Sequence, residues 1–271
     1  METYQVAILI PHYNNPKGLI MSVDSIEANV PTLIMVIDDG SDIYCKPNSE
    51  ELHDRVTNKV NLTLKYIELE ENIGIENVLN IGLQNLINNY STTFIARLDC
   101  GDICHKNRLN LQLDFLARHS DISLVGTWAE VIDEHGNHLY NLKTPTSQDA
   151  INKKMNIAIA FVHPTIMFRT KALEAVGFYP QGFTTAEDYA FLFNFVNKLK
   201  TANLPKILLF KERSVESIST KKRRKQILTR FRVIYKYGQP GIYYFYGLVR
   251  TMLLLFVPYK LMEYLKERFL S

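Results

Sequence analysis

The chain has 271 residues, 46% of them hydrophobic and 22% charged, a balance typical of a folded globular protein that excludes global disorder. Its length suits one large α/β domain, or a domain with an appendage. Three cysteines, an odd and sparse count, exclude a disulfide framework and suit a reducing compartment. The net charge is +3, but residues 221–271 carry +10, so residues 1–220 carry −7. An acidic body with a basic tail indicates two surfaces with different partners.

Apolar runs and helical periodicities alternate over the first hundred residues. Four runs predict strands buried on both faces of a sheet, at 6–10, 33–37, 62–67 and 93–98. Helical spacing of apolar residues predicts connecting helices at 19–27 and 75–87. This pattern predicts an α/β fold with a doubly wound, mostly parallel sheet flanked by helices. No basic segment precedes the first run, so we interpret it as a strand and not as a signal peptide.

The centre of the chain is mixed in pattern. Strands are predicted at 122–128, 130–133 and 166–168, and a helix is predicted at 187–198. Ligands of α/β sheets bind beyond the carboxyl ends of the strands, where the chain here repeatedly becomes polar or glycine-containing. The composition turns basic near 216–221, which predicts a main domain over 1–218 and a basic, aromatic, amphipathic helical extension over 219–271.

Six segments occur in an order and at spacings that resemble a known family. They are AILIPHYNN, MVIDDGSD, ENIGIENVLNIGL, IARLDCGDICHKNRLNLQLDFL, VHPTIMFR and AEDYAFLF. Together, over residues 4–215, they resemble family 2 glycosyltransferases of the GT-A fold, in particular bacterial enzymes that build O-antigen and capsule repeats. The resemblance implies a nucleotide-sugar half at about 1–105 and an acceptor half at about 106–218. It also implies inversion of the anomeric centre in a single displacement, without a protein nucleophile.

Donor-binding residues follow from the first three segments. The resemblance implies that Tyr13, in the Pro-x-Tyr-Asn motif that begins at Pro11, stacks on a uracil; the alternative is a tyrosine packed on the sheet edge. Asp38 is expected to accept hydrogen bonds from the base or ribose, whereas Asp39 suits a structural cap. Gly74 permits a close approach of backbone to the donor, or forms a plain helix-entry turn.

Two carboxylates, Asp99 and Asp102, end the fourth predicted strand, where the donor diphosphate is expected. Carboxylates placed so closely suit Mn²⁺ or Mg²⁺, which prefer oxygen ligands. We expect Asp99 to lie near both the ribose and the metal, and Arg97 to pair with one of the acids or with a phosphate. Relatives commonly have a further acid where this chain has Gly101. The alternative for Asp102 is an N-cap of the helix that begins near Asn107.

The last two segments supply candidates for catalysis and for the acceptor. Asp188 is the predicted general base that takes the acceptor hydroxyl proton, and the adjacent Glu187 is its rival. The resemblance places His163 near the acceptor and metal, although a lone histidine is often structural. Trp128 can stack on an acceptor sugar or belong to the core.

The extension over 219–271 joins a cluster of lysines and arginines to an apolar, tyrosine-rich run that contains Arg250 near its middle. A central arginine disfavours insertion across a bilayer, so we expect the extension to lie on an anionic membrane surface. This location, peripheral on the inner face of the cell membrane, suits a polyprenyl-diphosphate-linked acceptor. The alternatives are helices packed on the main domain or on a second copy of the chain. No nucleic-acid-binding motif accompanies the basic residues.

Three functions are compatible with these features. The first is transfer of a hexose or N-acetylhexosamine from a nucleotide sugar, with UDP favoured, to a lipid-linked saccharide. The second is nucleotidyl transfer, which usually needs a glycine-rich basic loop after the first strand, unlike PHYNNPKG. The third is a non-catalytic module that binds nucleotide sugars or glycans, for which Gly101 in place of an acid is the only support.

Overall fold

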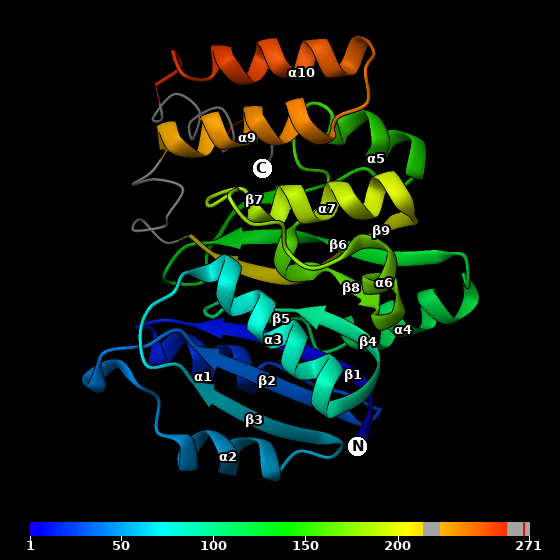
Figure 1. The fold of residues 1–271 in the computed structure, drawn as a ribbon. Coiled ribbons are helices and arrows are strands. Elements are labelled where there is room, and N and C mark those ends of the chain that lie inside the picture. Colours follow the sequence, from blue (N-terminus) through cyan, green and yellow to red (C-terminus); the bar gives the residue numbers. More distant parts are fainter. Residues whose placement is uncertain (214–222, 259–267, 269–271) are drawn as a thin grey trace.

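One mixed sheet of nine strands organises the molecule (Figure 1). The computed structural model describes residues 1–213, 223–258 and 268. The strands are β1 (Glu2–His12), β2 (Thr32–Asp38), β3 (Leu62–Glu68), β4 (Tyr90–Arg97), β5 (Ile103–Cys104), β6 (Ile122–Ile132), β7 (His138–Leu142), β8 (Met167–Arg169) and β9 (Lys200–Glu212). Their order is β3-β2-β1-β4-β8-β6-β9-β5, and β7 pairs with β6. The fold is α/β, as predicted.

Helices follow most of the strands and cover the sheet. The α-helices of the described residues are α1 (Pro16–Asp24), α2 (Ser49–Thr57), α3 (Ile75–Asn89), α4 (Arg108–Arg118), α5 (Gln148–Met155), α6 (Leu173–Val176), α7 (Glu187–Lys198), α9 (Arg223–Tyr237) and α10 (Ile242–Leu253). Short 3₁₀ turns lie at Ile43–Cys45, His163–Thr165 and Thr170–Ala172.

The first four strands form a parallel unit that aligns the predicted donor-binding residues. β1 lies between β2 and β4 and pairs in parallel with both. Its apolar run is buried on both sides, which explains why the sequence shows no polar alternation there. The register places His12 opposite Asp38 and Leu9 opposite Arg97. The carboxyl ends of these strands therefore meet at one edge of the sheet.

The remaining strands differ from the expectation of a mostly parallel sheet. β8 pairs antiparallel with β4 and β6, β7 pairs antiparallel with β6, and only β6 and β9 are parallel. β5 pairs antiparallel with the end of β9 through Cys104 and Leu209. This pairing brings β9 back to the chain that follows Asp102. The parallel prediction thus holds for the N-terminal half, and the sheet as a whole is mixed.

Two apolar cores lie on opposite faces of the sheet. One contains side chains of α3, α7 and α9, including Leu83, Phe195 and Ile234. The other contains side chains of α1, α2 and α4, including Leu19 and Leu113. The helices of each face thus bury their apolar side against the same sheet, as the periodicities predict.

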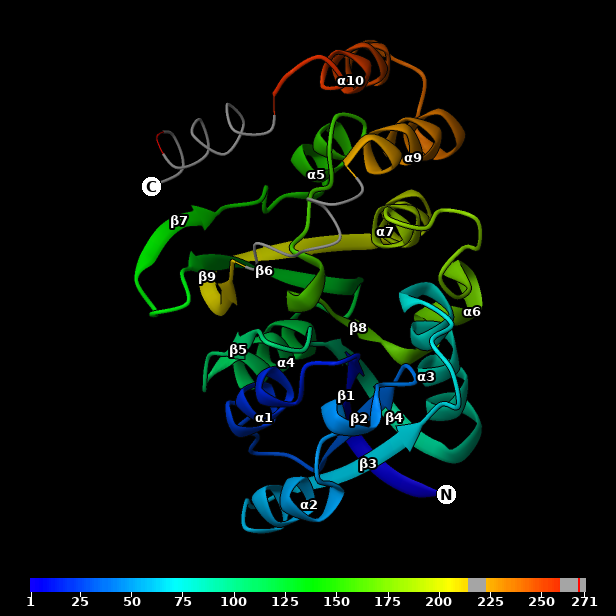
Figure 2. The same cartoon turned by 90° about the vertical axis from the view of Figure 1, so that its left-hand side faces the viewer.

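The C-terminal helices stack outward from the sheet. α9 packs on α7, and α10 packs on α9 (Figures 1 and 2). Gly247 of α10 lies so close to Asn156, just after α5, that a β-carbon there would meet the Asn156 carbonyl oxygen. None of the described helices combines the length and apolarity that crossing a membrane requires. The predicted boundary at 216–221 and the end of the extension lie outside the described residues, apart from Arg268.

Candidate active site

Asp38 is held in a buried polar network at the carboxyl end of β2. Its Oδ1 accepts hydrogen bonds from the Ser41 amide (3.0 Å) and hydroxyl (2.5 Å), and the Tyr66 hydroxyl donates to Oδ2 (2.5 Å). His12 Nδ1 lies 3.4 Å from Oδ1. Burial acts to raise the pKa of this carboxyl, but the hydrogen bonds hold it well below its usual range. Asp38 is therefore a fixed, ionised acceptor at the sheet edge.

Asp39 and Gly74 together form the entry to α3. Asp39 accepts from the amides of Ile73 (2.7 Å) and Gly74 (3.1 Å), which matches the structural role expected for it. Gly74 has φ +86°, a conformation that favours glycine, and space for a β-carbon is open there.

Tyr13, on the loop after β1, exposes half of its surface, whereas Pro11 is buried within β1. A ring at position 13 is thus accessible to a ligand.

A tight turn places Asp99 and Asp102 side by side. The Asp102 amide donates to the Asp99 carbonyl (3.1 Å), and the Ser22 hydroxyl accepts from the Gly101 amide and donates to the Asp102 carbonyl (both 2.9 Å). Gly101 has φ +98°, where a side chain would be strained. The cap of α4 is Asn107, which excludes the alternative that Asp102 caps this helix.

Two cations face the two acids. Arg97, 1% exposed, donates to Asp99 Oδ1 (2.6 Å) and to the Leu9 carbonyl (2.5 Å). Lys211 of β9 places its Nζ 3.3 Å from Asp102 Oδ2 and 3.8 Å from Asp99 Oδ2. Burial and the Asp99 charge raise the pKa of Asp102 to about 7, against the effect of Lys211. Burial acts to raise the pKa of Asp99 too, but Arg97 and Lys211 hold it below its usual range.

The acid pair has the chemistry of a divalent-cation site that a ligand completes. Within the described part of the chain, no three His, Cys, Asp or Glu side chains converge as a metal site does. Mg²⁺ is usually held by one or two carboxylates together with substrate phosphates and water. Asp99, one third exposed, and Asp102 supply such a pair of oxygen donors. These residues therefore fit a cation shared with a diphosphate.

Glu187 and Asp188 form the first turn of α7. The Tyr189 amide donates to Asp188 Oδ1 (2.7 Å), and burial followed by the Asp99 charge raises the pKa of Asp188, while Arg230 of α9 opposes this shift. Burial and the Asp188 charge raise the pKa of Glu187 to about 7. The charge of Asp99 is thus one of the causes of the raised pKa of Asp188.

The loop before α7 is strained and is braced from α3. Thr185 has φ +82°, an outlier for a β-branched residue. Glu76 of α3 accepts from the Gly182 amide (3.2 Å) and is buried. Strain of this kind persists where surrounding structure enforces it, commonly at functional sites.

His163 is positioned by a second link to α3. Asn80 holds both backbone groups of Tyr179 (2.9 and 3.0 Å), and the Tyr179 hydroxyl is 2.8 Å from His163 Nε2. Burial and then the charge of Arg97 lower the pKa of His163 to about 3, so the ring is neutral near pH 7. Trp128 is half-buried on β6 and donates to the Thr144 carbonyl (2.8 Å).

Several residues of this site had no signal in the sequence. His12 and Tyr66 both contact Asp38. The sequence indicated only that His12 lies at the end of the first predicted strand, and it gave no indication of a role for Tyr66. Lys211 reaches the acids from a strand that the sequence did not predict. Glu76 accepts from the Gly182 amide, and the Tyr179 hydroxyl contacts His163. Contacts of this kind between distant residues cannot be recognised from a pattern of residue types.

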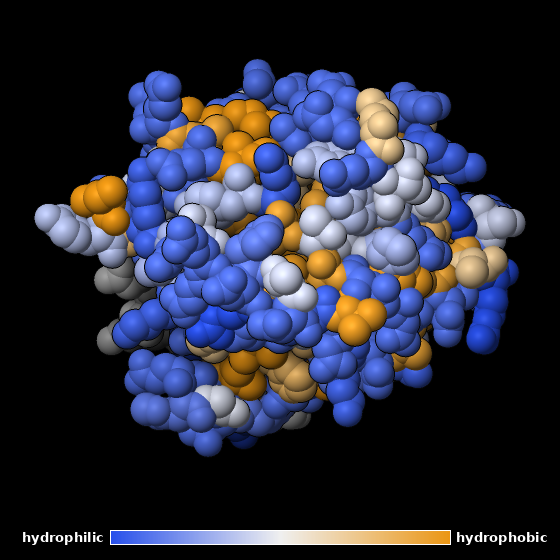
Figure 3. All heavy atoms as spheres, turned by 90° about the horizontal axis from the view of Figure 1, so that it is seen from below, coloured by the Kyte–Doolittle hydropathy of each residue, from blue (hydrophilic) through white to orange (hydrophobic). Residues whose placement is uncertain are grey.

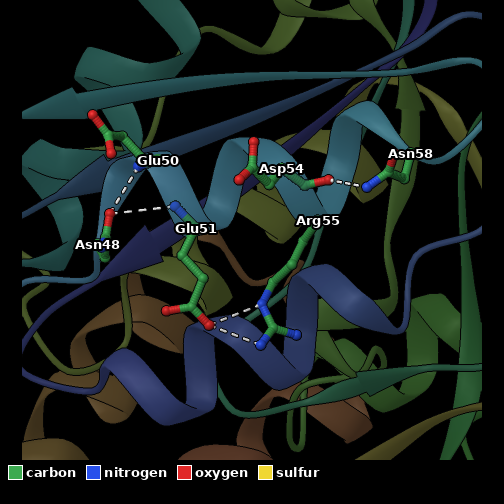
Figure 4. Close-up of a pocket in the computed structure, with 6 residues that line it drawn as sticks. All are labelled: Asn48, Glu50, Glu51, Asp54, Arg55 and Asn58. Carbon is green, nitrogen blue, oxygen red and sulfur yellow. Dashed lines mark hydrogen bonds and ion pairs between the residues drawn. The ribbon is translucent and has the colours of Figure 1, made fainter.

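A hollow of about 420 Å³ lies on α2 (Figure 4). Its lining residues are Asn48, Glu50, Glu51, Asp54, Arg55 and Asn58. Arg55 and Glu51 pair with each other (2.8 Å), and Asn48 caps the helix. The lining is exposed helix surface, so it adds nothing to the site.

Relatives of the chain are named as glycosyltransferases. A sequence 29% identical, covering 97% of this chain and 98% of the relative, is the amylovoran biosynthesis glycosyltransferase AmsE of Erwinia amylovora. Another, 25% identical over 77% of this chain and 74% of the relative, is the Escherichia coli UDP-Gal:alpha-D-GlcNAc-diphosphoundecaprenol beta-1,3-galactosyltransferase.

Solved structures share the GT-A fold. Staphylococcus aureus TarS 1–349 with UDP-GlcNAc has a TM-score of 0.65 at 16% identity, covering 98% of this chain and 79% of TarS 1–349. The mannosyltransferase PcManGT of Pyrobaculum calidifontis with GDP-Man and Mn²⁺ has a TM-score of 0.64 at 14% identity. The match covers 98% of this chain and 74% of the PcManGT chain. The model of the family described as Glycosyl transferase family 2 matches residues 7–177. The chain belongs to this family of glycosyltransferases.

Proposed function

We propose that the protein transfers a hexose or N-acetylhexosamine, with inversion, from a UDP-sugar to a hydroxyl of a polyprenyl-diphosphate-linked saccharide. The observation that carries this proposal is the Asp99–Asp102 turn just after β4, together with Asp188 in the first turn of α7, whose pKa the charge of Asp99 helps to raise. The galactosyltransferase relative from Escherichia coli, whose name specifies a UDP-sugar and a diphosphoundecaprenol acceptor, supports both substrate classes.

Asp188 takes the acceptor proton in this proposal. A base needs a pKa near the working pH, and the raised pKa of Asp188 moves it in that direction. The charge of Asp188 in turn raises the pKa of Glu187, the residue immediately before it. The acceptor oxygen attacks the anomeric carbon while the bond to the nucleoside diphosphate breaks, and Asp188 receives the hydroxyl proton.

Donor binding divides among three places. Tyr13 offers a ring for the uracil, and Asp38 accepts from the base or ribose. Asp99 and Asp102 would hold Mn²⁺ or Mg²⁺, which stabilises the charge of the departing diphosphate. Arg97 acts on the site through Asp99, because its guanidinium is buried and committed to protein oxygens.

Calorimetric titration of the full chain with UDP-, GDP- and dTDP-sugars, with and without Mn²⁺, tests this proposal. We expect a UDP-sugar to bind most tightly, and a transfer assay with a synthetic lipid-diphosphate saccharide to release UDP and yield an elongated product. Binding without any transfer to glycan acceptors would favour a non-catalytic module. Absence of binding to all nucleotide sugars would refute the proposal.

A second part of the proposal concerns location: α10 lies on the inner face of the cell membrane. Its outward side chains are large, apolar and exposed, among them Ile242 (80%), Phe245 (62%), Val249 (60%) and Leu253 (59%). They recur at intervals of three or four residues and so share one helix face. The opposite end of the molecule is mainly hydrophilic, with apolar side chains in small patches (Figure 3). Such an asymmetry suits interfacial binding.

Flotation with vesicles that contain phosphatidylglycerol tests this location. We expect the wild-type chain to float, and Phe245→Ser with Val249→Ser to reduce flotation strongly. A matched control is Tyr44→Ser. Tyr44 is also exposed, but it is distant from α10 in the sequence and lies in the 3₁₀ turn Ile43–Cys45. Equal flotation of all variants would contradict the role of α10. A dimer that the α10 substitutions dissociate would instead assign this face to a second copy of the chain.

A further inference from the structure

Lys211 stands out among the charged residues of the site because the sequence motifs assign it no role. It lies near the end of β9, in register with Val131 of β6, and its Nζ approaches both members of the acid pair. The pairing of β5 with β9 holds it there, since Ile103 lies opposite Phe210. Lys211 is thus fixed by the sheet at the place expected for the donor diphosphate.

The contacts of Lys211 leave it able to bind a ligand. An ammonium group has three N–H donors. Among the described residues, Asp102 is its only hydrogen-bond acceptor (3.3 Å), because Asp99 Oδ2 is at 3.8 Å. More than a third of the side chain is exposed. Donors therefore remain for oxygens of a bound anion.

The charges of the acid pair are balanced by two cations, one of which is Lys211. Arg97 and Lys211 match the charges of Asp99 and Asp102, and Arg97 is buried behind Asp99. Without Lys211 the turn would present net negative charge to an incoming diphosphate. A diphosphate and a pair of carboxylates repel each other unless a cation lies between them.

We propose that Lys211 binds the diphosphate of the nucleotide donor directly, so that nucleoside diphosphate binding persists when divalent cations are removed. The proposal rests on the proposed function and assigns one of its binding contacts to a named side chain. Asp99 and Asp102 would hold a divalent cation in the proposed function, and Lys211 lies beside the same two carboxylates as a resident positive charge.

Calorimetric titration of the full chain with UDP in excess EDTA tests this inference. A hydrogen-bonded charge pair contributes enough that Lys211→Met should weaken UDP binding by about tenfold or more. Lys211→Arg, which keeps the charge, should retain most of the affinity. The control is Lys200→Met: Lys200 begins the same strand and pairs with Asp121 (3.1 Å), so this variant removes one charge without touching the acid pair. Circular dichroism confirms that each variant is folded.

The outcomes separate the two proposals. Wild-type protein that binds UDP only with Mn²⁺, or a folded Lys211→Met variant with wild-type affinity in EDTA, overturns the inference and leaves the proposed function intact. Equal weakening by Lys200→Met also overturns it, because the effect would then be one of overall charge. Wild-type protein that binds no UDP under either condition overturns both.

Discussion

Replacing Asp188 by Asn removes the proposed general base with little change in shape. The Asn side-chain oxygen can still accept from the Tyr189 amide, which now donates to Asp188 Oδ1 at 2.7 Å, so the first turn of α7 should persist. The amide cannot take a proton from the acceptor hydroxyl. The substitution therefore separates the chemistry of this side chain from its structural contact.

The expected loss follows from the usual contribution of a general base. Positioned bases accelerate reactions by about 10²–10⁴-fold, equivalent to about 3–5 kcal/mol of barrier. We expect kcat of Asp188→Asn to fall by about this factor, while UDP affinity stays close to that of the wild type. Initial rates of UDP release with acceptor measure the first quantity, and calorimetry measures the second.

The pH dependence supplies an independent check on the same residue. Only the ionised carboxylate accepts a proton, so kcat/KM should fall as the pH drops through the pKa of Asp188. Because burial and Asp99 raise that pKa, the fall should lie at a higher pH than for an exposed aspartate. Near-wild-type turnover of Asp188→Asn, or a large loss confined to the matched Glu187→Gln variant, would refute the assignment and favour Glu187 as the base.

Three further predictions concern stability. The pKa of Glu187 is raised from 4.5 to about 7, so the folded state binds protons more tightly and loses stability as the pH rises over that interval; Glu187→Gln should flatten this decline in Tm. Gly101→Asp restores an acid at a φ of +98° and should cost about 1–3 kcal/mol in chemical denaturation. Gly247→Ala brings a β-carbon against the Asn156 carbonyl and should lower stability by about 1–3 kcal/mol, whereas Gly241→Ala, with open space and extended backbone, should not. A Gly247→Ala variant as stable as wild type would contradict the close packing of α10.

Elements with strong local patterns were predicted well from the sequence. The predicted helix over 187–198 has the bounds of α7, and the apolar runs at 6–10 and 33–37 lie within β1 and β2. In contrast, β9 was missed because Pro205 interrupts its pattern. The structure accommodates this proline at a register shift, between Leu204 opposite Thr127 and Ile207 opposite Trp128. A bulge of this kind depends on the partner strand, which the local sequence does not specify.

The residues of the site likewise include some that were predictable from the sequence and some that were not. Asp38, Asp99 and Asp102 were predictable because parallel strands bring their carboxyl ends to one edge. The contact of Lys211 with Asp102 joins residues 109 positions apart, and it depends on the two-residue strand β5. No periodicity can reveal so short a strand, so this cation was invisible without the fold.

Gly101 and Lys211 both affect how the acid pair is presented. A glycine with φ +98° lets the turn close on Ser22, and Asp102 then faces β9. With no acid at position 101, the turn carries two carboxylates rather than three. Lys211 and the buried Arg97 suffice to balance these two charges, whereas a third would leave excess negative charge beside the diphosphate. We therefore interpret the two carboxylates of this turn and the two cations beside them as one charge-balanced cluster.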